Sequence, residues 1–348
     1  MESRAHCVGF SVMEIGNRKE RVRDYASFPD KSLRRVRVAT RRKPSRTLLV
    51  PRSNPFAERI PSTGDEDVRS LVKKTIFLSC SHFVVRSLGF LLRIWLSREL
   101  GAQAMGICEL AQSAQMLLIT PVVSGLPMAV TRMSAKESEG RRVRTLRCAA
   151  ALSLAVSLAL ALFAFLGREA LCAWLGDMRT MPALLLYLPC IPILGMSCVL
   201  NGYAYGIGKP IAPAVGELLE QVVRALLCVR LVYGLRGMPL TLVAAIPAAA
   251  ALAGETAGFL LILTVSLRTL LRRGEGARRP IFRELLALAL PLTGMRLVSA
   301  LMQTVNASLI PARLRLFGFS AEQAMASLGI FHGMLKPVLM MPSFIVCS

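Results

Sequence analysis

Three cationic side chains recur along a stretch of sequence that is otherwise almost entirely apolar or small. They are His82, Arg86 and Arg93, within residues 75–96. At about 100° per residue on a helix, they fall at roughly 0°, 40° and 20°, which is one narrow stripe on one side. A charge surrounded by hydrocarbon is costly, so the stripe is expected to face a watery cavity or an anionic partner. It predicts a polar path for something negatively charged.

Each residue of the stripe also has a structural interpretation. A single histidine in a helix is more often a packed hydrogen-bonding group than a titrating one, and we favour packing for His82. Arg93 lies near the end of the stretch, where its head group could reach the membrane interface. For Arg86 a role in a cavity is favoured over a structural ion pair.

A second polar group lies within residues 211–235. Its members are Glu217, Glu220, Gln221 and Arg224, at helical angles of about 0°, 300°, 40° and 340°, so they share one face. Glu220 and Arg224 are four residues apart and can pair along the helix, which lowers the cost of burial. Two interpretations stay open: a cavity wall or a proton- or cation-responsive gate, and a structural pair near a helix end.

A third polar face includes Arg296, with Ser299, Gln303 and Asn306 within about 80° of helical arc. Interhelical hydrogen bonding is the better explanation for Gln303 and Asn306. A cavity role is favoured for Arg296, because no acidic residue lies within one turn of it. Other possible cavity linings, without a strong pattern, are Glu109, Glu255, His332 and Lys336.

Membrane helices are the elements that must position these side chains. The chain of 348 residues is 54% hydrophobic, and its mean hydropathy of +0.52 is too apolar for an ordinary soluble domain. A helix needs about 20 apolar residues to cross a bilayer. The sequence predicts an all-α polytopic membrane protein, with a fourth span bent by Pro182, Pro189 and Pro192. Eight spans are expected, near 75–96, 104–131, 148–167, 181–205, 211–235, 239–267, 284–311 and 323–347.

The net charge of +22 is concentrated in the N-terminal segment and in two loops, 132–147 and 268–283. Basic loops beside membrane helices favour the cytoplasmic side, so we expect a cytoplasmic N-terminus and a multi-pass protein of the cytoplasmic membrane. Contact with anionic membrane lipids is expected, and nucleic-acid binding is not. Residues 1–70 are predicted to be disordered. They would be a cytoplasmic tail, a lipid-binding arm or, as we favour, sequence upstream of a misplaced start codon.

An internal repeat divides the remainder of the chain. The sequence Gln103-Ala-Met-Gly opens the second span and returns as Gln323-Ala-Met-Ala at the eighth, 220 residues later. Both copies run in the same direction, which is typical of transporters built from two lobes. The expected units are a basic extension, 1–70, a first lobe of six transmembrane helices, 71–267, a basic cytoplasmic linker, 268–283, and the start of a second lobe with two transmembrane helices, 284–348.

Enzyme motifs do not match. Gly206-Ile-Gly-Lys209 is followed by Pro210, so it does not form a P-loop, and neither H-E-x-x-H nor G-x-S-x-G occurs. The nine cysteines contain no C-x-x-C, so neither a zinc site nor a disulfide framework is suggested. We expect no enzymatic activity, no cofactor and no metal.

Several motifs resemble stage V sporulation protein B and its relatives, the polysaccharide-type exporters of the superfamily that also contains MATE drug exporters and lipid II flippases. The resemblance covers roughly residues 70–348. The motifs that carry it include Ser124-Gly-Leu-Pro-Met-Ala-Val-Thr, Gly216-Glu-Leu-Leu-Glu-Gln-Val-Val-Arg224, Pro291-Leu-Thr-Gly-Met-Arg-Leu-Val-Ser and Leu339-Met-Met-Pro-Ser.

The resemblance implies two lobes around a central cavity and a monomeric flippase for an undecaprenyl-linked saccharide or peptidoglycan precursor, used in spore cortex or envelope synthesis. Arg86, Arg93 and Arg296 would attract the pyrophosphate of that substrate. Family members continue through a full second lobe, so we expect this chain, which ends at Ser348, to be truncated. Two alternatives remain: a cation-coupled multidrug exporter, disfavoured because it predicts an acidic first-lobe cavity, and a membrane scaffold for envelope synthesis.

Overall fold

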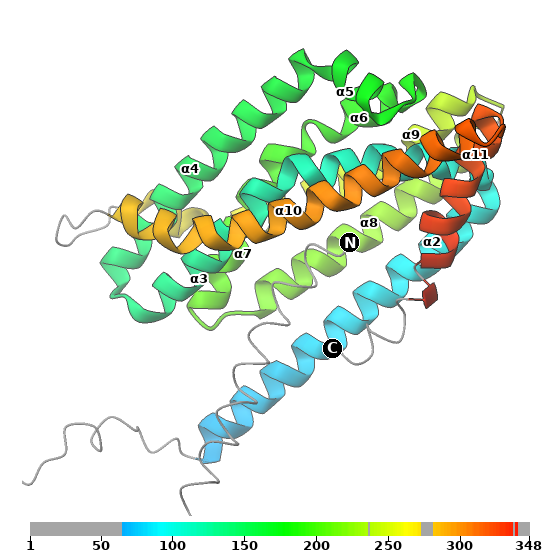
Figure 1. The fold of residues 1–348 in the computed structure, drawn as a ribbon. Coiled ribbons are helices and arrows are strands. Elements are labelled where there is room, and N and C mark those ends of the chain that lie inside the picture. The colour runs from blue at the N-terminus through cyan, green and yellow to red at the C-terminus, as the bar shows by residue number, and fades with distance from the viewer. Residues whose placement is uncertain (1–64, 236, 273–280, 337, 340–348) are drawn as a thin grey trace, which may run out of the picture.

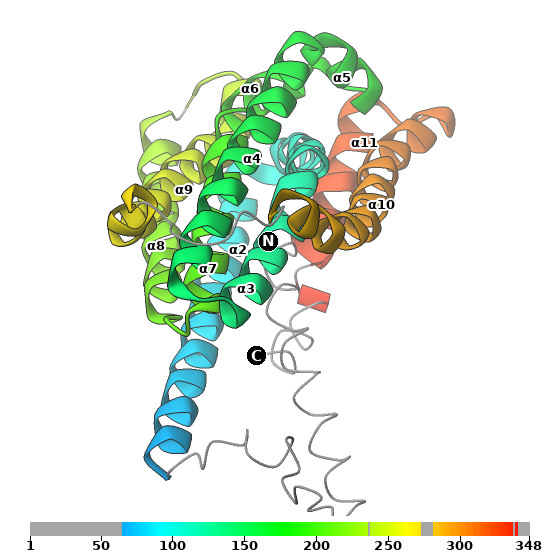
Figure 2. The same ribbon diagram turned by 90° about the vertical axis from the view of Figure 1, so that its left-hand side faces the viewer.

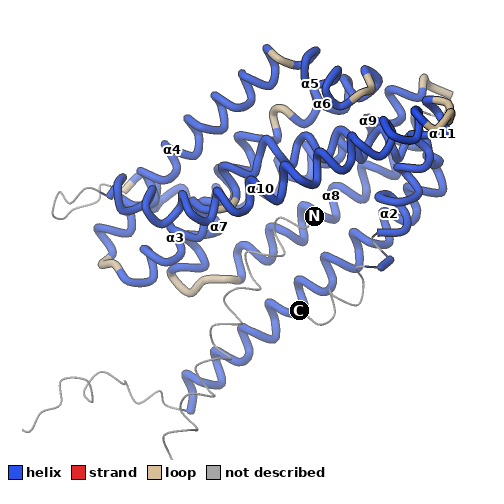
Figure 3. Tube along the Cα trace, viewed as in Figure 1, coloured by secondary structure: helices blue, strands red, loops and turns tan. Residues whose placement is uncertain are grey.

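The computed structural model describes residues 65–235, 237–272, 281–336 and 338–339, and every regular element in them is a helix (Figure 3). The all-α prediction is therefore confirmed. The predicted extension, 1–70, lies outside the described residues up to residue 64, and helix α2 begins at Asp65, before the predicted boundary. The helices are α2 (Asp65–Val123), α3 (Gly125–Lys136), α4 (Glu139–Leu166), α5 (Arg168–Leu175), η2 (Met178–Thr180), α6 (Met181–Tyr187), α7 (Cys190–Gly206), α8 (Ile211–Gly234), α9 (Leu240–Leu271), α10 (Ile281–Leu316), α11 (Ala321–Leu328) and the π-helix η3 (Gly329–Leu335).

Helix α2 is central to the bundle. Its first part, 65–100, extends beyond the other helices at its N-terminal end (Figure 1). Its second part, 102–123, lies between α8 and α9 on one side and α10 and α11 on the other (Figure 2), and it contacts all four. Helix α2 therefore connects the two groups directly, and α10 also packs against α3 and α4.

The predicted number of eight spans is not established by the helices. Four helices of the described chain are long and apolar enough to cross a membrane, and a fifth is obtained if 178–206, bent by 40°, is one span. The first of these, 75–136, contains two predicted spans, because only Gly101 interrupts the helix between them. Helix α8 is excluded by its charges, Glu217, Glu220, Arg224 and Arg230. The predicted bend is confirmed, since α6 ends at Tyr187 and α7 begins after Pro189.

The two copies of the repeat begin alike and then cross. A glycine in the left-handed region precedes each copy, Gly101 with φ 78° and Gly318 with φ 91°, a conformation that is costly for residues with a side chain. Farther along, Gly106 lies against the backbone carbonyl of Met325, and Gly329 lies against that of Ala102. A side chain at either glycine would collide with backbone, so α2 and the α11–η3 segment approach as closely as two helices can.

The two basic loops lie at the opposite end of the bundle. Arg141 Nη2 donates to Glu284 Oε2 over 2.7 Å, and Arg272 Nη1 donates to Glu139 Oε1 over 3.0 Å. These contacts bring the start of α4 to the residues on either side of 273–280, which lie outside the described part of the chain. At the same end Gly125 packs directly against the carbonyl of Ala289 on α10. That this side is cytoplasmic stays a prediction from the positive charge.

Candidate functional site

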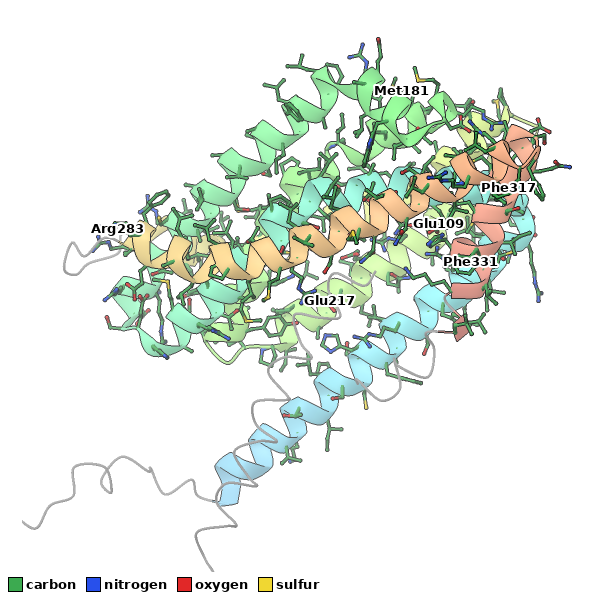
Figure 4. The ribbon with its side chains drawn as sticks, viewed as in Figure 1. Glu109, Met181, Glu217, Arg283, Phe317 and Phe331 are labelled. Atoms are coloured by element: carbon green, nitrogen blue, oxygen red, sulfur yellow. The ribbon has the colours of Figure 1, made fainter. Side chains whose placement is uncertain are left out.

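His82, the first residue of the stripe on α2, contacts the polar face of α8. His82 Nε2 lies 3.4 Å from Glu217 Oε2, and their side chains are only 13% and 17% exposed. Figure 4 shows Glu217 on α8, beside the first part of α2. The contact is an ion pair when the imidazole is protonated. Helical periodicity placed each residue on the correct face, and the structure joins the two faces.

Arg93 connects three segments of the chain. Its guanidinium donates to Glu109 on the second part of α2, to the carbonyl of Gly333 from Nε over 3.0 Å, and to the carbonyl of His332 from Nη2 over 3.2 Å. Both carbonyls belong to the π-helix η3, a wide-turn geometry often associated with functional sites. Arg93 therefore holds the first predicted span to the second and to the second copy of the repeat. Its predicted role in a substrate cavity is untested, and these partners favour a structural one.

Arg224 lies between two buried carboxylates. Its Nη2 donates to Glu220 Oε1 over 2.6 Å and to Glu255 Oε1 over 3.0 Å. The Glu220–Arg224 pairing expected from the spacing is confirmed. Glu255 comes from α9, which approaches closely because Gly254 leaves room for the backbone carbonyl of Glu220. Glu220 and Glu255 are each 7% exposed, and two carboxylates on one guanidinium give the cluster a formal charge of −1.

Gln221 lies beside this cluster in sequence and is 2% exposed. Within the described part of the chain its Nε2 has no hydrogen-bond partner. A buried amide in that state is uncommon, since most buried polar atoms are hydrogen-bonded. The predicted polar face of α8 is therefore present, with three of its four members in ion pairs and the fourth buried.

The two remaining candidate cations are separated. Arg86 is half-buried on α2, between the positions of His82 and Arg93 along the same face. Arg296 is half-buried on α10, and among the described residues it makes no hydrogen bond or ion pair. The structure therefore brings His82, Glu217, Glu220 and Arg224 onto two adjoining helices and leaves Arg296 on a third, α10.

One side chain, Thr304, and the arginine partners of Glu109 and Glu255 were not found by sequence reasoning. Gln303 and Asn306, expected to hydrogen-bond between helices, are exposed. Thr304, buried next to them, makes the interhelical bond instead, with its Oγ1 donating to the carbonyl of Ser113 over 2.9 Å. Glu109 and Glu255 pair with arginines on other segments. Periodicity along one helix cannot identify such partners.

The polar interior contains charges of both signs, paired with one another. Arg93 is neutralised by Glu109, and Arg224 by Glu220 and Glu255. This polar interior is therefore lined by both cations and carboxylates, whereas the stripe by itself predicted a cationic lining. Charges held in membrane helices are typical of substrate and ion pathways, and such buried networks are sensitive to the loss of any one partner.

Comparisons with known proteins agree with the motifs. The family model described as polysaccharide biosynthesis protein matches residues 71–348. Stage V sporulation protein B of Bacillus subtilis (strain 168) is 27% identical over 297 residues, 80% of this chain and 56% of the relative. Sporulation protein YkvU of the same organism is 23% identical over 295 residues, 80% of this chain and 63% of the relative. The chain thus spans less than two thirds of the length of these relatives.

Solved structures show the same fold. An inward-facing multidrug resistance MATE family transporter of the MOP superfamily aligns with a TM-score of 0.59, covering 76% of this chain and 64% of that one at 17% identity. An outward-facing conformation of such a transporter aligns with a TM-score of 0.54, covering 78% and 66% at 17% identity. At this identity the likeness concerns the fold alone.

Proposed function

The chain belongs to the polysaccharide biosynthesis protein family, and on that premise we propose that it moves an anionic lipid-linked saccharide across the cytoplasmic membrane. The observation that carries the proposal is Arg86, a half-buried guanidinium within an apolar membrane helix, one turn from the His82–Glu217 contact. A charge kept at that depth is expected to serve a path for substrate or ions.

The substrate class follows from the chemistry of arginine. A guanidinium presents a planar fork of donors that matches phosphate oxygens, and it stays charged at any physiological pH. Arg86 on α2 and Arg296 on α10 would attract the pyrophosphate of an undecaprenyl-linked saccharide or peptidoglycan precursor. A role in spore cortex or envelope synthesis is proposed with it, since both relatives are sporulation proteins by name.

The pairs around Arg86 would control access to it. His82–Glu217 connects α2 to α8, and Glu220–Arg224–Glu255 connects α8 to α9. Movement of α8 relative to its neighbours requires one of these contacts to rearrange. His82–Glu217 is the weaker one, because its two atoms are 3.4 Å apart, against 2.6 and 3.0 Å in the arginine cluster. We infer that this contact is the gate and that the arginine cluster is the fixed point.

A second candidate function has one observation in its favour. Four carboxylates, those of Glu109, Glu217, Glu220 and Glu255, lie in the interior of the first lobe. Such groups suit a cation-coupled multidrug exporter. Arg93, Arg224 and His82 occupy all four, which is why we favour the anionic substrate. A scaffold without transport would require none of these charges.

Reconstitution into liposomes would test the proposal, with a fluorescent polyprenyl-pyrophosphate saccharide placed in one leaflet. The full chain is compared with Arg86→Ala, Arg86→Lys and the matched control Arg98→Ala, an exposed arginine at the end of the same helical segment. Loss of a charged hydrogen bond is worth about 1.5–3 kcal/mol, so Arg86→Ala should slow movement by at least roughly tenfold. Arg98→Ala should behave as the unaltered protein.

Two results would argue against the assignment. Equal transport by Arg86→Ala and the parent would remove Arg86 from the substrate path. Drug resistance on expression, together with no movement of the saccharide lipid, would favour the multidrug exporter.

A further inference from the structure

An apolar groove runs between the first part of α2 and α8, on the side away from the cationic stripe. It has a volume of about 260 Å³. Its lining is aliphatic and aromatic throughout: Leu88, Leu91, Leu92, Trp95, Ala225, Val229 and Tyr233. The rings of Trp95 and Tyr233 lie near its end, with centroids 6.2 Å apart. Aromatic side chains of this kind are enriched where a membrane meets water.

The predicted spans place this groove against hydrocarbon. Leu91 is 61% exposed and Tyr233 is 53% exposed, and both lie on helices that carry the predicted spans. Pockets that enclose a whole drug-sized ligand are roughly 300–1,000 Å³ in volume. The groove is smaller and open along one side, so it suits a segment of a chain.

The two faces of α2 are divided between charge and hydrocarbon. On a helical count that starts at His82, the stripe occupies about 0–40°, whereas the four leucine and tryptophan positions fall at about 180–280°. His82 and Arg86 come first along the helix, and Trp95 lies about 13 Å beyond Arg86 at 1.5 Å per residue. If the N-terminus is cytoplasmic, the charged residues lie nearer the cytoplasmic side and the apolar groove lies farther along the helix. A lipid in the cytoplasmic leaflet has the same order, with its polar head first and its tail beyond it.

We propose that this groove holds the hydrocarbon tail of the anionic lipid, in the segment next to its phosphates, while the head lies on the Arg86 side of α2. The proposal rests on the proposed function and names how the same substrate is bound. A lipid head that enters the interior must leave its tail in hydrocarbon, so the tail has to pass between two helices. The α2–α8 groove is lined by apolar side chains and lies on the opposite face of the helix that carries the stripe.

Photolabelling of the full chain in phosphatidylcholine nanodiscs would test this, with a polyprenyl pyrophosphate that carries a diazirine in its first isoprene units. Labels are expected on peptides that contain residues 88–95 and 225–233. Leu91→Trp and Val229→Trp fill the groove from its two walls. Each should lower the labelling on the order of tenfold, the loss expected when about two methylene groups are no longer buried. Leu260→Trp adds the same bulk at a 53% exposed position on α9 and should change nothing.

Competition separates the substrate from ordinary lipid. Excess unlabelled polyprenyl pyrophosphate should remove the label, and excess phosphatidylglycerol should not. Equal competition by phosphatidylglycerol, or unchanged labelling of both tryptophan variants, would overturn the proposal. Transport by the full chain that is unaffected by Leu91→Trp would reject the groove alone, whereas absent transport with intact labelling would reject the proposed function and keep the binding site.

Discussion

Replacement of Arg93 by methionine should destabilise the contact between the two copies of the repeat. The guanidinium bonds to Glu109 and to the carbonyls of His332 and Gly333, and methionine keeps most of its length without the charge. Glu109 would then lie in the same place with no cation opposite it. The carbonyls of η3 would lose their donors at the same time.

The magnitude follows from burial. Removal of one partner of a buried pair costs about 3–5 kcal/mol, chiefly because the other charge is left unpaired. The side chains of Arg93 and Glu109 are 21% and 14% exposed, which places the cost near the lower end, about 3 kcal/mol. Glu109→Met should cost less, about 2 kcal/mol, because Arg93 keeps its two carbonyl acceptors. The double variant removes both charges and should cost about the same as either single variant.

Reversible unfolding in mixed micelles measures the free energies of unfolding for the four proteins of this cycle. The expected coupling between Arg93 and Glu109 is about 2 kcal/mol, within the range for residues in direct contact. Arg98→Met, at an exposed position on the same helical segment, should stay within about 0.5 kcal/mol of the parent. A coupling below about 0.5 kcal/mol would refute the reasoning, since it would mean that Glu109 gains nothing from the guanidinium.

Two further outcomes can be measured in the same way. Arg224→Met should lower the free energy of unfolding by about 3–5 kcal/mol, because Glu220 and Glu255 are left facing each other. Glu255→Gln keeps the Glu220–Arg224 pair and should lower it clearly less. Equal losses for the two variants would show that the cluster does not act through charge. Gly106→Ala should be destabilising, because its Cβ would meet the backbone carbonyl of Met325. The control Gly294→Ala, inside α10 with no atom near the new Cβ, should be neutral or stabilising by about 0.5–1 kcal/mol. A neutral Gly106→Ala would exclude the close contact between α2 and α11.

The sequence predicted relations within a helix better than relations between helices. The faces of α2 and α8 and the Glu220–Arg224 pair follow from a period of 3.6 residues, and each is present. The partners Glu109 and Glu255 do not follow from it, because they come from segments that only the fold brings together. Arg93 was grouped with a cavity because it shares the helical face of His82 and Arg86, and its partner Glu109 was not foreseen.

The ends of helices were predicted less well where a single residue interrupts a long helix. The sequence placed a loop between the first two predicted spans, and the structure has a continuous helix with a single break at Gly101. The proline bend of the fourth span was found because proline removes a backbone donor wherever it occurs. The count of spans differs for three reasons. The first two predicted spans form one long helix, and the predicted span 323–347 lies partly outside the described residues. Helix α8 is too charged to be recognised by hydropathy, although it carries much of the candidate site.

The glycine contacts at the two ends of the bundle act as alternative pivots. Gly106 meets Met325 at one end, and Gly125, the first residue of α3, meets Ala289 at the other. They are 19 residues apart along α2 and the start of α3, which is about 28 Å at the helical rise. A rotation of α10 and α11 by about 10° around either contact displaces the other by about 5 Å, more than a backbone contact survives. Only one contact can then persist during such a rocking motion, so opening at one end entails closure at the other without a separate lock.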